Sequence, residues 1–169
     1  LKTAKHKKLG GHLPDIDFGL LDTTTNTALI CELKWFLAAD SSKEVYARED
    51  EITHGCEQIE SVMTYAMVNR SRFIKQVFDV DNGECVDLFC CVIARHNIRS
   101  KHKYVPVIDL QKFKELLLTK PVNNVFHIIR NREYDEPFPE NASISHQVIN
   151  YGDYTFKIPA IRFESIPRK

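Results

Sequence analysis

The feature that most constrains this sequence is an apolar segment near its amino-terminal end that finishes on two opposite charges. Residues 28–36 read Ala-Leu-Ile-Cys-Glu-Leu-Lys-Trp-Phe and are rich in residues that favour β-strands. Residues 17–22 form a similar segment, and residues 23–27, with Asn26 as a typical turn residue, separate the two. The pattern predicts a β-hairpin. Because side chains alternate across a strand, Glu32 and Lys34 are expected on one face.

A carboxylate and an ammonium in such an apolar run are costly to bury unless they find partners. Asp15 and Asp17, in the sequence Pro-Asp-Ile-Asp at 14–17, precede or begin the first strand and can supply a partner. Two carboxylates bind a hard divalent cation through oxygen. A lysine beside that cation can orient or deprotonate a water molecule and stabilise charge on a phosphate. The hairpin is therefore a candidate metal site for phosphate chemistry.

These residues resemble the signature of the PD-(D/E)xK nuclease superfamily, which has the restriction-endonuclease-like fold. The resemblance spans about residues 11–109, and the few residues that define it are those at 14–17 and the triplet Glu32-Leu33-Lys34. It implies that an aspartate and Glu32 hold Mg²⁺ or Mn²⁺ with the backbone carbonyl of Leu33, while Lys34 assists the attacking water. Asp15 matches the literal motif, whereas Asp17 matches members with an acid-Ile-Asp sequence. We favour Asp17, which is closer to the strand and to Glu32, and keep Asp15 as a possible accessory residue.

The function implied by this resemblance is metal-dependent hydrolysis of phosphodiester bonds in nucleic acid, with DNA as the favoured substrate. Two alternatives stay open: an ion pair of Lys34 with Glu32 or Asp17 at a strand edge, and a nuclease-like fold that only binds nucleic acid or a protein. Members of the superfamily commonly begin with a helix that can add an acid to the site, but residues 1–13 hold no acid. The chain begins at Leu1, so we expect a fragment of a longer protein, completed by other domains or by a homo-oligomer.

Basic residues gather in two segments that contain no acid, residues 1–13 and residues 95–103. In the second, the candidates for contacts with phosphate are Arg95, Arg99, Lys101 and Lys103. The formal net charge of the chain is zero, with 23 basic and 23 acidic residues. Binding of nucleic acid would therefore depend on local patches rather than on overall charge. A solvated terminus and a solvated loop are the competing interpretations of these segments.

Length and composition indicate one globular domain. A chain of 169 residues can bury a sizeable core, with the core at about residues 11–132 and an extension at about 133–169. Apolar residues make up 43% and charged residues 27%, and no apolar run is long enough to span a membrane. The five cysteines contain no CxxC motif, which favours reduced thiols and a reducing, cytoplasmic compartment.

The segments after the hairpin alternate between helix and strand patterns. Ser41 and Glu44 predict the start of a helix whose apolar stripe consists of Ile52, Cys56, Ile59, Met63 and Ala66. Gln58 lies off this stripe, and some branches of the superfamily carry a glutamine on this helix facing the site. A short helix at 71–78, a buried strand at 86–94 and a strand at 104–108 follow, the last one at an edge because of Pro106.

The remaining residues predict two more helices and a separate hairpin. Asp109 caps a helix that continues to about Leu118, and Pro121 opens a helix that continues to about Arg132. Residues 133–140 predict a loop, and residues 147–163 a β-hairpin. The fold expected is therefore α/β: a central mixed sheet that begins with an antiparallel hairpin and is flanked by helices, as in restriction endonucleases, with a C-terminal hairpin as an appendage.

Overall fold

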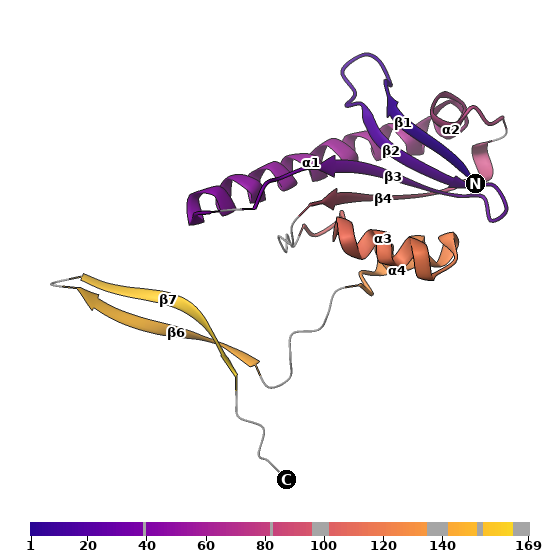
Figure 1. Cartoon of the computed structure of the whole chain (residues 1–169). Helices are drawn as coiled ribbons and strands as arrows, with labels where there is room; N and C mark the ends of the chain where they lie inside the picture. Colours follow the sequence, from indigo (N-terminus) through magenta and orange to yellow (C-terminus); the bar gives the residue numbers. More distant parts are fainter. Residues whose placement is uncertain (39, 82, 96–101, 135–141, 152–153, 164–169) are drawn as a thin grey trace, which may run out of the picture. The chain divides into compact units, whose positions relative to one another are not determined.

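The computed structural model describes residues 1–38, 40–81, 83–95, 102–134, 142–151 and 154–163. The chain divides into two units, Leu1–Tyr134 and Asp135–Lys169. The first unit holds the sheet, the helices and the candidate site, and the second holds a β-hairpin (Figure 1).

A mixed sheet of five strands is the centre of the first unit. The strands are β1 (Lys2–Lys7), β2 (Ile16–Asp22), β3 (Thr27–Lys34), β4 (Asp87–Ala94) and β5 (Val107–Asp109), and they lie in this order across the sheet. The neighbours β1, β2 and β3 are antiparallel, whereas β3, β4 and β5 are parallel. This confirms the predicted α/β fold with a mixed sheet that begins antiparallel.

Helices cover both faces of this sheet (Figure 1). One face packs against α1 (Ser42–Val68) and α2 (Arg70–Phe78), and the other packs against α3 (Leu110–Thr119) and α4 (Val122–Asn131). The alternation along β3 divides the core accordingly: Ala28 and Ile30 belong to the cluster with α1, and Leu29 and Cys31 to the cluster with α3 and α4. The even-numbered positions of β3 therefore point towards α1.

Local hydrogen bonds explain where the helices begin. The Ser41 hydroxyl accepts a hydrogen bond from the Glu44 backbone N–H at 3.3 Å, and the Glu44 carboxylate accepts one from the Asp40 backbone N–H at 2.8 Å. The second contact is shifted by one residue from the usual capping box, in which the Ser41 N–H would be the donor. The Asp109 carboxylate accepts from the Gln111 N–H at 2.8 Å and so caps α3 as predicted.

Two features of the sheet differ from the sequence-based expectations. The segment Lys2–Lys7 is not only a basic terminus but the edge strand β1, in which Ala4 is the buried residue. Strand β5 is shorter than expected and begins after Pro106, whose carbonyl accepts a hydrogen bond from the Val92 N–H at 2.9 Å. Proline cannot donate to the ladder, so pairing through N–H groups starts only beyond it.

The second unit is an antiparallel pair of strands, β6 (Ala142–Tyr151) and β7 (Tyr154–Phe163). The ladder runs from the pair Ala142–Phe163 to the pair Tyr151–Tyr154, so the hairpin predicted at 147–163 is longer on its first strand. Most of the loop predicted at 133–140 lies outside the described residues. None of the helices in the described part of the chain is long and apolar enough to cross a membrane.

Candidate active site

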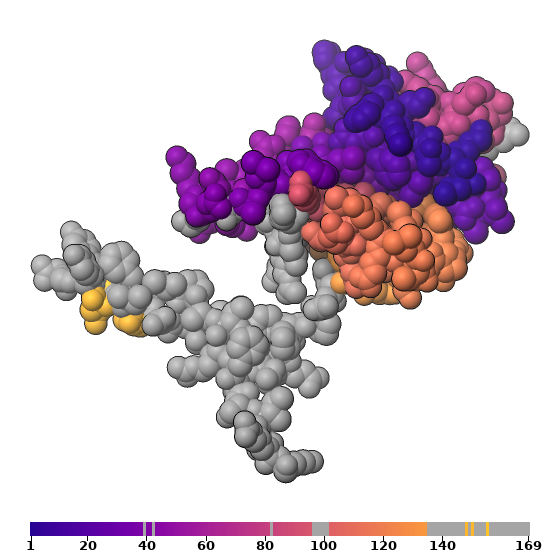
Figure 2. Space-filling view, in the orientation of Figure 1, coloured from indigo at the N-terminus to yellow at the C-terminus, as the bar shows by residue number. Residues whose placement is uncertain are grey.

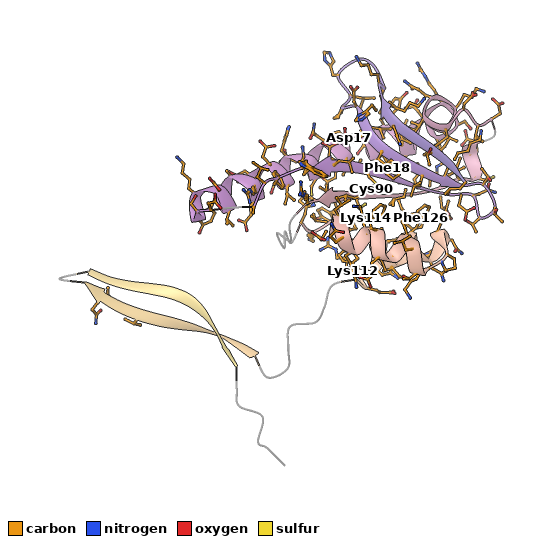
Figure 3. All side chains as sticks on the ribbon, in the orientation of Figure 1. Asp17, Phe18, Cys90, Lys112, Lys114 and Phe126 are labelled. Carbon is orange, nitrogen blue, oxygen red and sulfur yellow. The ribbon has the colours of Figure 1, made fainter. Side chains whose placement is uncertain are left out.

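The hairpin brings Asp17, Glu32 and Lys34 together at the end of the sheet towards which β3 and β4 run. The ladder between β2 and β3 ends with Phe18 opposite Cys31. Asp17 and Glu32 are therefore the next pair of opposite positions towards the end of the sheet. Gly19, two residues from Asp17, contacts Phe78 of α2, which places Asp17 on the same face as Glu32 and Lys34. Figure 3 labels Asp17 at this end of the hairpin.

The carboxylate of Asp17 is fixed by the backbone of the neighbouring strand. Its Oδ2 atom accepts a hydrogen bond from the Leu33 N–H at 2.9 Å. This bond continues the contact between the two strands beyond the last backbone pair, and it holds the carboxylate beside the triplet Glu32-Leu33-Lys34. The other oxygen, Oδ1, lies 4.0 Å from Nδ1 of the exposed His6 on β1.

The ammonium of Lys34 has two partners. Its Nζ atom lies 3.1 Å from Glu32 Oε1 and donates a hydrogen bond to Gln58 Oε1 at 3.0 Å. Both members of the ion pair are largely shielded, with 14% of the Lys34 side chain and 9% of the Glu32 side chain exposed. Gln58 belongs to α1, so the ammonium joins the helix to the end of β3.

Gly55 allows α1 to approach this pair closely. A Cβ atom added at Gly55 would lie 2.6 Å from Lys34 Cε and 3.4 Å from Glu32 Cγ. The stem of Lys34 therefore crosses the helix at the one position where no side chain is in its way. No sequence pattern identifies Lys34 as the residue that this glycine accommodates.

Burial raises the pKa of Glu32 above its ordinary value, and the negative charge of Asp17 raises the pKa further. The hydrogen bond and charge of Lys34 act in the opposite direction, and the net shift is upwards. Burial thus outweighs the stabilising effect of the ammonium, and the charge of Asp17 adds to it. A cation at this position would relieve the excess negative charge, and carboxylate oxygens are the donors that Mg²⁺ and Mn²⁺ prefer.

The remaining residues predicted for the metal site contribute less. Asp15 is exposed, and Leu33 contributes its backbone N–H through the bond to Asp17 while its side chain is 42% exposed. Within the described ranges, no three His, Cys, Asp or Glu side chains form a group that could hold a metal ion. The site therefore consists of two carboxylates, a lysine and a glutamine, and the described chain adds no third acid.

Two of the four predicted phosphate-binding residues, Arg95 and Lys103, belong to the part of the chain that the structure describes. Arg99 and Lys101 lie outside the described residues. Arg95 follows β4 directly, and its backbone N–H donates to the Lys34 carbonyl at 2.9 Å. Lys103 is exposed, with Nζ 5.2 Å from the centre of the Tyr104 ring. Arg95 is thus adjacent to the candidate site through the backbone of the sheet.

One residue of this region was not recognised from the sequence. Trp35 was assigned to the end of the apolar strand, but β3 ends at Lys34 and the Trp35 side chain is 68% exposed. Its ring lies 4.3 Å from the Arg95 guanidinium carbon. An apolar run does not reveal where a sheet ends, so the exposure of Trp35 had no sequence signal.

Comparisons of the chain with protein-family models, with curated proteins and with solved structures found no significant match.

Proposed function

We propose that the protein is a metal-dependent nuclease that hydrolyses phosphodiester bonds, with DNA as the favoured substrate. The observation that carries the proposal is the grouping of Asp17, Glu32 and Lys34 on one face, with a raised pKa at Glu32. A raised pKa beside a specific charged partner is typical of functional sites. The antiparallel order of β1, β2 and β3, followed by α1 and a parallel β4, supports a restriction-endonuclease-like fold.

The side chains divide the chemistry between them. Asp17 and Glu32 would hold Mg²⁺, which when bound supplies Lewis-acid stabilisation of the phosphate and a more acidic water. The Leu33 N–H holds the Asp17 carboxylate in place at 2.9 Å. Lys34 is in position to orient the attacking water and to stabilise negative charge on the phosphate. Gln58 gives the ammonium a second partner, so Lys34 is held at the site by α1 as well as by Glu32.

A second candidate function is a non-catalytic module that binds nucleic acid or a protein through a nuclease-like fold. The observation that favours it is the shielded ion pair of Lys34 with Glu32 in a site that has two carboxylates and no third acid among the described residues. In that case Lys34 would serve the structure of the strand end. We also propose a reducing, cytoplasmic compartment, and the five free thiols support it.

Cleavage of a supercoiled plasmid and of a single-stranded oligonucleotide tests the two functions. We expect cleavage that requires Mg²⁺ or Mn²⁺ and that falls by about 100-fold or more in Glu32→Gln, which loses a metal-holding charge, and in Lys34→Met, which loses the positive charge for the phosphate. The matched control is Glu84→Gln, which removes an exposed carboxylate just before the start of β4, at the other end of the sheet, and should leave cleavage unchanged. Full activity of Glu32→Gln would exclude the nuclease proposal. A folded wild-type protein that binds DNA but does not cleave it would favour the second function.

A further inference from the structure

Trp35 is the one tryptophan of the sequence, and its side chain is 68% exposed. A large exposed aromatic side chain is more informative than an exposed leucine, because its burial would normally contribute strongly to the core. Trp35 directly follows the candidate catalytic Lys34 at the end of β3. Its exposure at this place suggests a role in contact with another molecule.

Arg95 holds the ring of Trp35. The guanidinium carbon lies 4.3 Å from the ring centre, which is well within the range of a cation–π contact. Arg95 is itself attached to the end of β3 through its N–H, which donates to the Lys34 carbonyl at 2.9 Å. The ring is therefore oriented by a positive charge, while most of its surface stays open to solvent.

Continuing the alternation of β3 and β4 by one residue assigns the pair to the side of the sheet opposite the carboxylates. Along β3, Leu29 and Cys31 face α3 and α4, and along β4 so does Ile93, so the alternation continues to Trp35 and Arg95 on that side. Lys34 and Glu32 face α1. A chain of nucleotides that passes over the ends of β3 and β4 would meet the carboxylates on one side and the aromatic ring on the other.

The surrounding charges favour a polyanion on the side of Trp35. The first half of α1 projects beyond the strand ends in Figure 1 and protrudes from the first unit in Figure 2, and it presents the exposed acids Glu49, Asp50 and Glu51. Because β5 is parallel to β4, α3 begins at the same end of the sheet as Trp35. This helix carries Lys112, whose ammonium lies 3.3 Å from the Glu115 carboxylate, and the exposed Lys114; both lysines are labelled in Figure 3. Phosphate groups would be repelled by the acids at 49–51 and attracted towards Arg95 and Lys114.

We propose that Trp35 and Arg95 form a stacking platform for an unpaired base of single-stranded nucleic acid next to the catalytic site. Every base has a π-face that can stack on an aromatic ring, and arginine adds positive charge for the neighbouring phosphate. A paired base in a duplex has both of its faces occupied by its neighbours. The inference rests on the proposed function for its substrate class, and it adds that the substrate is single-stranded at this position.

The fluorescence of Trp35 provides a direct test, because no other tryptophan contributes to the emission. The wild-type protein is titrated in EDTA with a single-stranded oligothymidylate, and binding is followed in parallel by the anisotropy of a labelled oligonucleotide. We expect the Trp35 emission to change in step with the anisotropy. A fully paired duplex of the same length should change the emission much less.

Substitutions test whether the ring contributes to affinity. Trp35→Ala should weaken the single-stranded complex by about 5- to 100-fold, and Trp35→Tyr should restore most of the affinity. The control is Tyr46→Ala, which removes a ring of α1 that is also 68% exposed and should leave affinity unchanged. Unchanged affinity of Trp35→Ala, an emission that does not respond to bound oligonucleotide, or an equal response to the duplex would each overturn the platform.

The outcomes for the platform and for the nuclease are separable. Cleavage that requires Mg²⁺, with no effect of Trp35→Ala on binding, would remove the platform and leave the nuclease in place. A response of Trp35 to single strands without any cleavage would support the platform and remove the catalytic function. No binding of either oligonucleotide would overturn the platform and leave a protein partner as the ligand of the exposed ring.

Discussion

Glu32 is the site residue whose charge is least well accommodated by the fold. Its carboxylate is buried and faces Asp17, and both effects raise its pKa in spite of the ion pair with Lys34. A group whose ionised form is disfavoured in the folded state lowers stability at the pH where it is ionised. Such a cost is common at sites that natural proteins retain for function.

This cost predicts a pH-dependent effect of Glu32→Gln. A folded-state pKa above the unfolded value means that the favourable contribution of Glu32 is fully present below its unfolded pKa, ordinarily near 4.5, and is lost as the pH rises through the folded-state pKa. Glu32→Gln should therefore raise the free energy of unfolding at neutral pH, and the gain should shrink as the pH falls below the folded-state pKa.

Urea unfolding from pH 4 to pH 8 measures this difference, with Glu49→Gln as the exposed control. Glutamine keeps the shape of the side chain and an oxygen that can accept from Lys34. If Glu32→Gln is less stable than the wild type at neutral pH, the charge of Lys34 outweighs the burial of Glu32, and the carboxylate is a structural ion-pair partner.

The residues of the site were predictable to different degrees. The alternation of side chains along a strand predicted that Glu32 and Lys34 share one face. The motif added Asp17, because the register of a hairpin fixes which residues of its two strands lie opposite each other. The sequence could propose Gln58 but could not show that it bonds Lys34, since that contact depends on how α1 crosses β3. The choice of Asp17 over Asp15 as the residue beside Glu32 agrees with the bond from Leu33 to Asp17.

At the scale of elements, the crossing of α1 over β3 is the contact that organises the site. At Gly55 the helix packs directly against the side chains of β3. The space that a Cβ atom would take there is bordered by Cε of Lys34 and Cγ of Glu32. Glycine within a helix destabilises it by about 1 kcal/mol relative to alanine. The helix thus accepts an unfavourable residue where the lysine stem must pass.

Gly55→Ala should separate the function from the stability of this element. The new Cβ would be 2.6 Å from Lys34 Cε, and the flexible end of the lysine would have to leave Glu32 and Gln58. We expect the free energy of unfolding to change by less than about 1 kcal/mol, since the gain in helix propensity offsets the displacement, while cleavage falls strongly. Chemical unfolding and the cleavage assay check the two effects.

Gly83→Ala is the matched comparison. At that position a Cβ would lie 2.5 Å from the Cβ of the buried Ile74, which cannot move like the end of a lysine. This variant should lose stability by about 1–3 kcal/mol through overpacking. A Gly55→Ala protein with full activity would show that Lys34 does not need its place between Glu32 and Gln58.

The elements that the sequence predicted are those with a dense apolar pattern or a defined cap. The hairpin, the helix after Ser41 and the helix capped by Asp109 are confirmed. Strand β1 was not predicted, because Lys2–Lys7 buries one side chain, Ala4, and its hydrogen bonds with β2 leave no trace in the sequence. Its lysines are typical of an edge strand protected against further pairing.

At the scale of the whole molecule, the balance of charges determines how a polyanion would bind. The sequence contains 23 basic and 23 acidic residues, so it has no overall attraction for nucleic acid. The acids at 49–51 of α1 instead create a local field opposite to that of Arg95 and Lys114. A cation bound by the two site carboxylates would neutralise their charge, and a phosphate could then lie at the strand ends without being repelled.

Binding of Mn²⁺ at neutral pH, measured by isothermal titration calorimetry, is the most direct test of the proposed metal site. We predict one ion per chain in the wild type, binding weakened by at least about 10-fold in Asp17→Asn and in Glu32→Gln, and unchanged binding in Asp15→Asn. The absence of binding by the folded wild type, or equal affinity of Asp17→Asn and the wild type, would contradict the assignment of Asp17 and Glu32 as the metal ligands of a nuclease.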